Sequence, residues 1–375
     1  MKGITFEPHQ KHFIDLARRH NRFGIFLPQG AGKTVTVLEI LRQKYESFGF
    51  LPTVIITPKS CMSTVWVREA NKWEFIYPLK VVKSLGGFLK KKPDGRQAIH
   101  VISTNSLISQ DVDDFFRTVN PMILIVDESS CFRNATAKRT RALVKQVVIP
   151  SSQPTRFKIP IVYLLSGTPR PRVCENLFSQ IFLLDGGLRL GRTLTAFRER
   201  YCAPYSPYSY GYPELPDTAD RVYEAIKDVA ETIKLPYSSN IAYQDIFCSF
   251  SPAEHKDYKA LERDAIETRE DGRKNVLPLG AVMMRLRQLA CGAYYSLDEK
   301  GAKCVKRFSK AKSDRFLDFL IEIGEENLLV GYQYTHQKAQ IKALLEKKGL
   351  AHACIDGSTS EKDRNKIVDQ WNDKK

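Results

Sequence analysis

Short apolar runs alternate with longer segments of mixed polarity through the first 165 residues of the chain. A continuous apolar run of this length is typical of a parallel strand that is buried on both faces. Such runs predict strands at Thr53–Thr57, Ile99–Ser103, Met122–Val126 and Ile161–Leu165. Helix-compatible segments lie between them, at Thr34–Tyr45, Ser60–Glu74 and Asn134–Val148. This alternation predicts an α/β fold in which helices cover both faces of a parallel sheet.

The alternation weakens after Gly186 and returns near Ile246. The segment Tyr201–Pro213 is rich in Tyr, Pro and Ser; we expect it to pack locally, although its tyrosines could instead stack on bases. Farther on, the pattern predicts helices at Asp314–Ile323 and Thr335–Lys348, and strands at Leu328–Gly331 and Leu350–Ile355. We therefore expect an N-terminal domain over 1–240, with a helical and loop insertion at about 186–240, and a second α/β domain over 241–375.

Basic residues are in excess: 58 Lys and Arg against 42 Asp and Glu give a net charge of +16. Such an excess favours a polyanionic partner, of which nucleic acid is the usual one. The eight cysteines form no C-x-x-C pair, which argues against a zinc ribbon and for a reducing compartment. No stretch reaches 18 apolar residues and the N-terminus lacks an apolar signal segment, so we expect a cytoplasmic protein without membrane association.

The segment GIFLPQGAGKT, which begins at Gly24, leads from an apolar run through a glycine-rich turn into a helix. Backbone N–H groups of such a turn can point at a phosphate, and the helix dipole favours an anion there. Lys33 can neutralise the β- and γ-phosphates, and the hydroxyl of Thr34 can bind Mg²⁺. Leu27 stands where the phosphate-loop pattern has Gly, and by itself the loop could be a structural turn. The residues expected to bind the nucleotide here are Gly30, Ala31, Gly32, Lys33 and Thr34.

Two carboxylates, Asp127 and Glu128, directly follow the apolar run Met122–Val126. Open α/β sheets bind their ligands at the carboxyl ends of the strands. Asp127 can hold Mg²⁺, and Glu128 can orient and deprotonate an attacking water molecule. By itself the pair could be a solvated turn after a core strand. Together with Lys33, it predicts nucleotide hydrolysis with Mg²⁺, in which Glu128, Asp127 and Lys33 are the catalytic residues.

Further short motifs follow one another in a set order. They are Gln10 ahead of the first strand, Thr57–Ser60 with Trp66 and Glu69 behind it, Ser103 with Thr104, Ser166–Pro169, and Cys354–Thr359. In this order and spacing the chain resembles helicase superfamily two, and most closely the Swi/Snf-type DNA translocases. Arg133 with Asn134 and the segment Leu286–Leu289 add to the resemblance, which extends from Gln10 to about Trp371.

The resemblance implies two RecA-like lobes with parallel sheets flanked by helices, helical insertions between the lobes, and an incomplete second lobe. It implies that Gln10 binds the adenine, to which an amide offers both a donor and an acceptor. It implies that Ser166, Gly167 and Thr168 couple the γ-phosphate state to lobe movement. Nucleic-acid backbone contacts are implied at Lys59, Ser60, Ser103, Thr104, Arg133, Asn134, Gly357 and Ser358. The expected function is an ATP-dependent motor on double-stranded DNA.

The sequence departs from the family pattern in three places. Leu27 and Pro28 replace the acidic pair usual before the phosphate loop, and Ser129-Ser130 stands where the family has Ala-His, so altered coupling to lobe movement is expected. The arginines of the family's last motifs would follow Lys375, and an arginine finger contributes about 10³–10⁵ in rate. We therefore expect weak hydrolysis unless a missing segment or a protein partner supplies these arginines.

Two other functions are compatible with the same residues. One is a strand-separating superfamily-two helicase acting on DNA or RNA. The other is a catalytically weak nucleic-acid-binding module that a partner or a missing segment completes; the retention of Lys33, Asp127 and Glu128 argues against it. The compact chain favours the cytoplasm of a bacterium or of a virus's host cell, or the nucleus if the source is eukaryotic.

Overall fold

The computed structural model describes residues 4–91, 97–149, 156–170, 172–204, 212–235, 242–270, 279–324 and 326–373. The chain divides into two compact units, Met1–Ser238 and Ser239–Lys375, and each is described here by itself. Most of the tyrosine-rich loop expected at 201–213 lies outside the described residues, because they exclude 205–211. Tyr201 itself is buried in the first unit.

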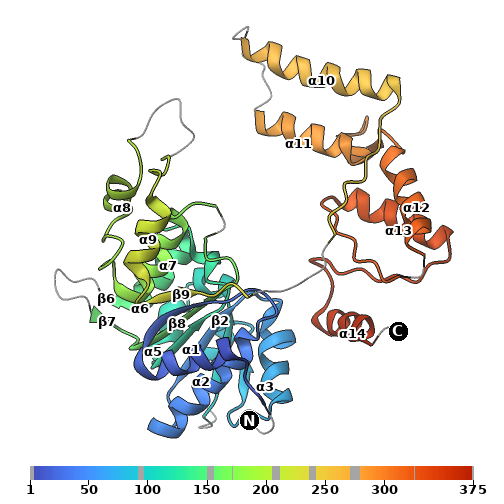
Figure 1. Ribbon diagram of the computed structural model, residues 1–375. Helices are drawn as coiled ribbons and strands as arrows, with labels where there is room; N and C mark the ends of the chain where they lie inside the picture. The colour runs from blue at the N-terminus through green and yellow to red at the C-terminus, as the bar shows by residue number, and fades with distance from the viewer. Residues whose placement is uncertain are drawn as a thin grey trace. The chain divides into compact units, whose positions relative to one another are not determined.

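The first unit is built on a seven-stranded sheet with the order β3-β4-β2-β5-β8-β1-β9 (Figure 1). Each neighbouring pair is parallel. The strands are β1 Arg22–Phe26, β2 Thr53–Thr57, β3 Leu79–Val81, β4 Ile99–Ser103, β5 Ile123–Val126, β8 Ile161–Ser166 and β9 Ala230–Thr232. The predicted parallel sheet is confirmed, and β2, β4, β5 and β8 begin and end within one residue of the predicted strands.

Helices cover both faces of this sheet, as the alternation predicted. Successive side chains of a strand point to opposite faces, so Ile55 packs in one core and Val54 and Ile56 pack in the other. The helices of the first unit are α1 Pro8–Arg19, α2 Lys33–Phe48, α3 Arg68–Lys72, α4 Leu85–Leu89, α5 Val112–Val119, α6 Lys138–Val147, α7 Glu175–Asp185, α8 Leu194–Tyr201 and α9 Thr218–Ile226. Helices α1 and α2 pack on one face, and α5, α6 and α7 pack on the other.

Some local elements differ from the prediction. The helix expected at Ser60–Glu74 is a π-helix, Met62–Val67, that continues into α3. Short 3₁₀ helices follow β4 and β5, at Thr104–Ile108 and Ser129–Phe132. A two-residue antiparallel pair, β6 Val148–Ile149 and β7 Arg156–Phe157, follows α6. Within 186–240, α8 and α9 pack on the core and β9 extends the sheet beside β1, an edge strand that the sequence pattern did not predict.

The second unit is helical with one small sheet. Its elements are α10 Pro252–Glu270, α11 Leu279–Ala290, β10 Ala293–Leu297, β11 Lys303–Arg307, α12 Ala311–Ile323, α13 Thr335–Lys347 and α14 Glu361–Asn372. The predicted helices at 314–323 and 335–348 are confirmed as α12 and α13. The predicted strands at Leu328–Gly331 and Leu350–Ile355 are wrong, since the structure describes no strand there and pairs only β10 with β11, antiparallel. An apolar run needs a hydrogen-bonding neighbour to become a strand, and Leu329 is instead 85% exposed.

The described helices include none that is both long enough and apolar enough to cross a membrane.

A buried arginine fastens the beginning of β1. Arg22 donates hydrogen bonds to the carbonyls of Leu184, at 2.7 Å, and of Ile159 and Leu183, and its guanidinium stacks on the ring of Phe157. Two of these carbonyls belong to the last turn of α7, where the helix dipole favours a cation. Burial lowers the pKa of Arg22 to about 9, so the side chain remains charged at neutral pH. The strand that leads into the glycine-rich turn is thereby tied to α7.

Replacing Arg22 with Met should lower the free energy of unfolding by about 3 kcal/mol, because buried carbonyls at the end of α7 would lose their donors. Urea denaturation followed by circular dichroism measures this change. Arg19→Met is the matched control on the exposed end of α1 and should stay within about 0.5 kcal/mol of the wild type. Equal losses in the two variants would contradict the assignment.

Candidate nucleotide site

The glycine-rich turn lies between β1 and α2, at the carboxyl edge of the parallel sheet. Gly30 and Gly32 have φ angles of +78° and +74°, in the left-handed region that side chains disfavour. A Cβ on Gly32 would be strained by this φ angle and would also displace Nε2 of Gln10, which lies 2.2 Å from the Cβ position. Because Lys33 begins α2, the turn presents the N-terminus of a 16-residue helix, which is suited to an anion.

Lys33 lies over this turn and close to the acidic pair. Its Nζ donates to the carbonyls of Leu27 and Pro28, both at 3.0 Å. Burial lowers the pKa of Lys33, and the negative charges of Glu128 and Asp127 oppose that shift. Both carboxylates therefore act on the ammonium group, although they lie more than 90 residues away in the chain. The structure brings together the two predicted motifs.

Two side chains of α1 contact the same turn. The amide of Gln10 accepts from the backbone N of Glu7 at 2.9 Å and donates to the carbonyl of Ala31 at 3.4 Å. Nε2 of His9 also donates to the Ala31 carbonyl, at 3.0 Å. Gln10 thus lies beside the loop, and its contact with adenine remains a prediction. No motif in the sequence indicated this role for His9, because no short-range signal could show its contact with a residue 22 positions away.

Asp127 is the most constrained residue of the site. Its Oδ2 accepts hydrogen bonds from Oγ1 of Thr57 and Nε1 of Trp66, both at 2.9 Å, and its Oδ1 accepts from the backbone N of Glu128 at 3.0 Å. Glu128 has a φ of +49°, which is uncommon for a residue with a side chain and is often found at functional sites. Burial raises the pKa of Glu128, the charge of Asp127 raises it further, and Lys33 opposes both.

Ser166 ends β8, the strand between β1 and β5. Its Oγ accepts from the backbone N of Thr168 at 3.1 Å. A Cβ on Gly167 would lie 3.5 Å from the carbonyl of Leu27 and the backbone N of Gln29, so this turn packs against the phosphate loop. Gly167, the middle one of the three predicted coupling residues, therefore lies close to the loop, and the coupling role of the three remains a prediction.

A buried glutamine joins the acidic pair to this turn. Oγ of Ser129 donates to Oε1 of Gln180 at 2.7 Å, and Nε2 of Gln180 donates to the carbonyl of Pro169 at 2.8 Å. Ser129 and Gln180 are fully buried. Sequence reasoning missed Gln180, as it missed the bonds from Thr57 and Trp66, because such pairings join residues far apart in the chain.

The oxygen atoms of this site suit a cation such as Mg²⁺, which needs few ligands from the protein. The described residues hold no group of three or more His, Cys, Asp or Glu side chains that could bind a metal. Mg²⁺ is usually held by one or two carboxylates, while water and substrate phosphates complete its shell. The carboxylate of Asp127 and the hydroxyl of Thr34, next to Lys33, fit this pattern.

The predicted nucleic-acid residues of the first unit follow strands at the same edge of the sheet. Lys59 and Ser60 are exposed after β2. Ser103 caps the 3₁₀ helix after β4 and is partly exposed, whereas Thr104 is buried, which leaves Ser103 the more accessible of the two. Arg133 and Asn134 are exposed after the acidic pair.

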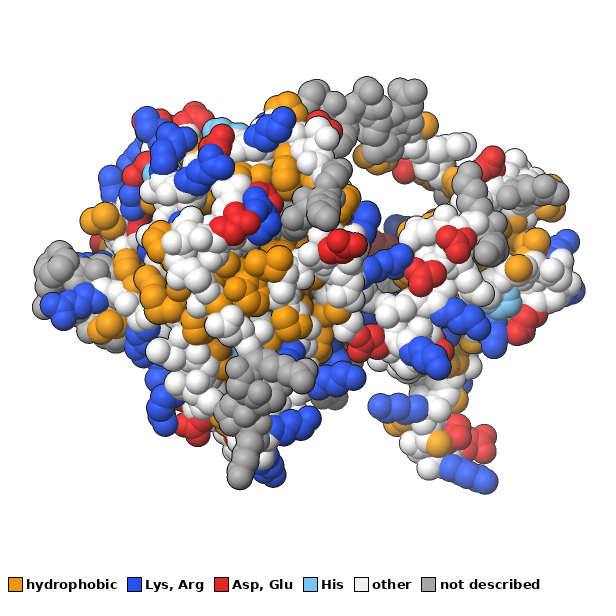
Figure 2. All heavy atoms as spheres, turned by 90° about the horizontal axis from the view of Figure 1, so that it is seen from below, with side chains coloured by type: hydrophobic (Ala, Val, Ile, Leu, Met, Phe, Trp, Pro, Cys, Tyr) orange, Lys and Arg blue, Asp and Glu red, His pale blue; other side chains and the backbone are white. Residues whose placement is uncertain are grey.

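In the second unit, Ser358 donates from its backbone N and its Oγ to Oδ1 of Asp356, at 2.8 and 2.6 Å. Gly357 lies in this exposed turn, and the ammonium group of Lys338 lowers the pKa of Asp356. Lys and Arg side chains are spread over both units on the face drawn in Figure 2. The two units thus each present accessible polar groups at the predicted positions.

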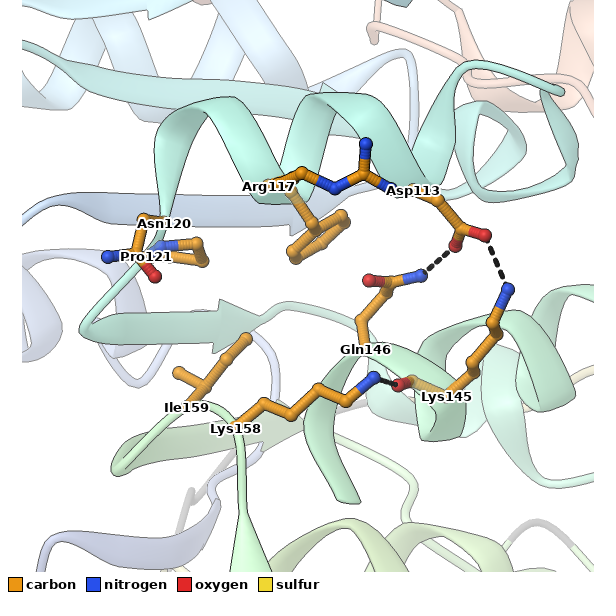
Figure 3. A pocket seen from close by; sticks show the side chains of 9 residues that line it. Asp113, Arg117, Asn120, Pro121, Lys145, Gln146, Lys158 and Ile159 are labelled. Carbon is orange, nitrogen blue, oxygen red and sulfur yellow. Dashed lines mark hydrogen bonds and ion pairs between the residues drawn. The ribbon is translucent and has the colours of Figure 1, made fainter. Parts of the chain in front are cut away.

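A hollow of about 480 Å³ lies at the opposite, amino edge of the sheet, where residues that precede β5 and β8 line it. Four of its polar residues are bonded to one another: Lys145 and Gln146 donate to Asp113, and Lys158 donates to the carbonyl of Lys145 (Figure 3). These bonds fasten α5 to α6. The hollow is therefore separate from the nucleotide site.

The model of the SNF2-related domain matches residues 11–295. The chain belongs to the SNF2-related domain family. It is a Swi/Snf-type, helicase-like protein of superfamily two, and its seven-stranded parallel sheet with helices on both faces is that of an SNF2 ATPase core. The resemblance inferred from the ordered motifs is confirmed.

Several known proteins resemble this chain. Protein p41 of Acyrthosiphon pisum secondary endosymbiont phage 1 is 24% identical over 372 residues, which cover 93% of this chain and 77% of that protein. The DNA annealing helicase and endonuclease ZRANB3 of Mus musculus is 29% identical over 208 residues, which cover 54% of this chain but 18% of ZRANB3. The Sulfolobus solfataricus SWI2/SNF2 ATPase core in complex with dsDNA has a TM-score of 0.51 at 16% identity, covering 98% of this chain and 75% of that one.

The SNF2-type site makes a prediction about the titration of Glu128. Because burial and Asp127 raise its pKa, this carboxyl should titrate above the ordinary Glu value of about 4.3. Lys33→Met should raise the pKa further, since it removes the opposing positive charge, whereas Lys44→Met on the same helix should leave it unchanged. Carbon-detected NMR of the Glu side chains, assigned with Glu128→Gln, measures the shift. A titration at or below the ordinary value would contradict this account.

Proposed function

We propose that this chain is the ATPase core of a motor that moves along double-stranded DNA. The observation that carries the proposal is that Lys33, the first residue of a helix, has its ammonium group within the electrostatic reach of the carboxylates of Asp127 and Glu128. This arrangement has the parts needed to bind a triphosphate and to activate water against it. The likeness to an ATPase core solved with dsDNA supports the choice of nucleic acid.

The site residues would divide the chemistry among them. Backbone N–H groups at Gly30–Gly32 and the ammonium of Lys33 would bind the phosphates and neutralise charge that develops during transfer. Thr34 and Asp127 would hold Mg²⁺, whose charge screens the phosphate oxygens. Glu128 would accept the proton of the attacking water, a role suited to a carboxyl with a raised pKa. Gln10 would contact the adenine from its place beside Ala31.

Movement would follow from contacts made by both units. Lys59, Ser60, Ser103, Arg133 and Asn134 would hold the DNA backbone from the first unit, as would Thr104 through its main chain, while Gly357 and Ser358 would hold it from the second. Contacts of this kind position a protein on DNA without reading sequence, as a motor that steps along any duplex requires. Ser166, Gly167 and Thr168 would transmit the state of the γ-phosphate, because their turn packs against the phosphate loop.

Lys33→Ala should abolish DNA-stimulated ATP hydrolysis, with a fall of about 10²–10³-fold, because the phosphates lose their principal positive charge. Steady-state phosphate release, with and without duplex DNA, measures this effect. Lys44→Ala removes a lysine from the same helix outside the loop and should retain the stimulation. Normal stimulated turnover by Lys33→Ala would overturn the site assignment. Stronger stimulation by single strands or by RNA than by duplex DNA would favour a strand-separating or an RNA helicase.

Salt dependence should reveal the phosphate contacts. Each phosphate that a protein neutralises steepens the fall of log affinity with log salt by about 0.9. Lys59→Ala and Arg133→Ala should therefore each reduce the slope for duplex DNA by about one, and affinity should fall equally for unrelated sequences. Arg117→Ala, at the opposite edge of the sheet, serves as the control and should leave the slope unchanged. Fluorescence anisotropy over a series of salt concentrations measures these slopes, and an unchanged slope in Lys59→Ala would refute its phosphate contact.

A further inference from the structure

One oxygen of Asp127 receives two side-chain hydrogen bonds from a single stretch of chain. Oγ1 of Thr57 and Nε1 of Trp66 both reach Oδ2 at 2.9 Å. Thr57 and Trp66 are fully buried, and Asp127 is 8% exposed. Hydrogen bonds to an ionised carboxylate are about twice as strong as neutral ones. These two donors fix the plane of the carboxylate, while Oδ1 accepts a hydrogen bond from the backbone N of Glu128.

The two donors lie at the two ends of a ten-residue segment. Thr57 closes β2, and its place beside Asp127 follows from the parallel register of Ile56 with Val126. Trp66 lies in the π-helix, a rare form that occurs frequently at functional sites. Between the two donors, Lys59 and Ser60 are exposed to solvent. Lys59 and Ser60 thus form an exposed tip, and the residues on either side of it, Thr57 and Trp66, bond the same carboxylate oxygen.

We propose that the segment Thr57–Trp66 positions Asp127 for Mg²⁺ and links that position to a nucleic-acid phosphate bound at Lys59 and Ser60. This inference rests on the proposed function, since it takes Asp127 as the metal ligand and the exposed tip as a DNA contact. Thr57 and Trp66 are positioning residues that act through Asp127. Removing such a partner of a metal ligand typically lowers metal affinity 10–100-fold.

A buried indole N–H group needs a hydrogen-bond acceptor in any protein. The test must therefore distinguish a bond that positions Asp127 from one that only satisfies the N–H group of Trp66. Trp73 offers the comparison. Its Nε1 donates to Oε2 of Glu69 at 2.8 Å, in the helical segment that follows the π-helix, and it makes no bond to Asp127. Trp66→Phe and Trp73→Phe therefore remove chemically equal bonds, of which one reaches the proposed metal ligand.

The first measurement is the Mg²⁺ concentration that half-saturates binding of a fluorescent, non-hydrolysable ATP analogue. Trp66→Phe should raise this concentration about 10-fold, whereas Trp73→Phe should stay within about twofold of the wild type. Analogue binding in EDTA should be unchanged in both variants. An unchanged Mg²⁺ requirement in Trp66→Phe, or an equal rise in Trp73→Phe, would overturn the inference.

Thr57 supplies a test that does not depend on replacing a large buried ring. Thr57→Val keeps the shape but removes the hydroxyl donor, and Thr57→Ser keeps the donor. The valine variant should raise the Mg²⁺ requirement in the same direction as Trp66→Phe, and the serine variant should restore it. If the valine variant binds Mg²⁺-analogue as the wild type does, Asp127 is not positioned through Thr57, and the inference fails.

The link to nucleic acid has its own optical readout. The chain has three tryptophans, so Trp73→Phe with Trp371→Phe leaves Trp66 as the sole tryptophan, whose fluorescence can be excited apart from that of the tyrosines. Its emission should change when Mg²⁺ and the analogue bind, and also when duplex DNA is added without nucleotide. Failure of DNA alone to change it would overturn the link. If the wild type does not bind the analogue in a Mg²⁺-dependent way, the proposed function itself is overturned. The Trp66 and Thr57 variants test only the further inference, so the two failures can be told apart.

Discussion

The site depends on the mutual attraction of one ammonium group and two carboxylates at the half-buried edge of the sheet. Burial disfavours the charged form of each of these groups. It lowers the pKa of Lys33 and raises that of Glu128, and each group opposes the shift of the other. Lys33 also donates hydrogen bonds to two loop carbonyls. A bound triphosphate with its cation would replace those carbonyls as the partner of Lys33.

The sheet explains how residues so far apart in the chain can interact. Its central order, β2-β5-β8-β1, places four strand ends side by side. They carry the Thr57 segment, the acidic pair, the Ser166 turn and the phosphate loop, in that order. Because helices cover both faces, the strands cannot shift without disturbing a packed core. The functional loops are thus held by the most rigid part of the unit, while their tips remain at its edge.

The sequence predicted this edge well because strands buried on both faces are continuous apolar runs, as in β2 and β5. It missed β3 and β9, which are three-residue edge strands with little apolar signal. It predicted strands at 328–331 and 350–355 that did not form, since an apolar run does not specify its hydrogen-bonding neighbour. In the site, spacing identified Lys33 and Asp127, but no pattern could indicate that Trp66 bonds a carboxylate 61 residues later.

Buried hydrogen bonds join the acidic pair and the neighbouring Ser129 to two other segments of the chain. Thr57 and Trp66 connect Asp127 with the exposed tip at Lys59, and Gln180 connects Ser129 with the turn after Ser166. A buried donor left without its acceptor costs about 1–3 kcal/mol. The Thr57–Trp66 segment and the turn after Ser166 therefore each incur this cost if they move away from their bonded partners, unless the partners move with them. Ser129 stands where the resembling family has Ala, and its hydroxyl makes the second link possible. The segment Thr57–Trp66 is therefore bonded to Asp127 and the turn after Ser166 to Ser129, so both are fastened to the residues that directly follow β5.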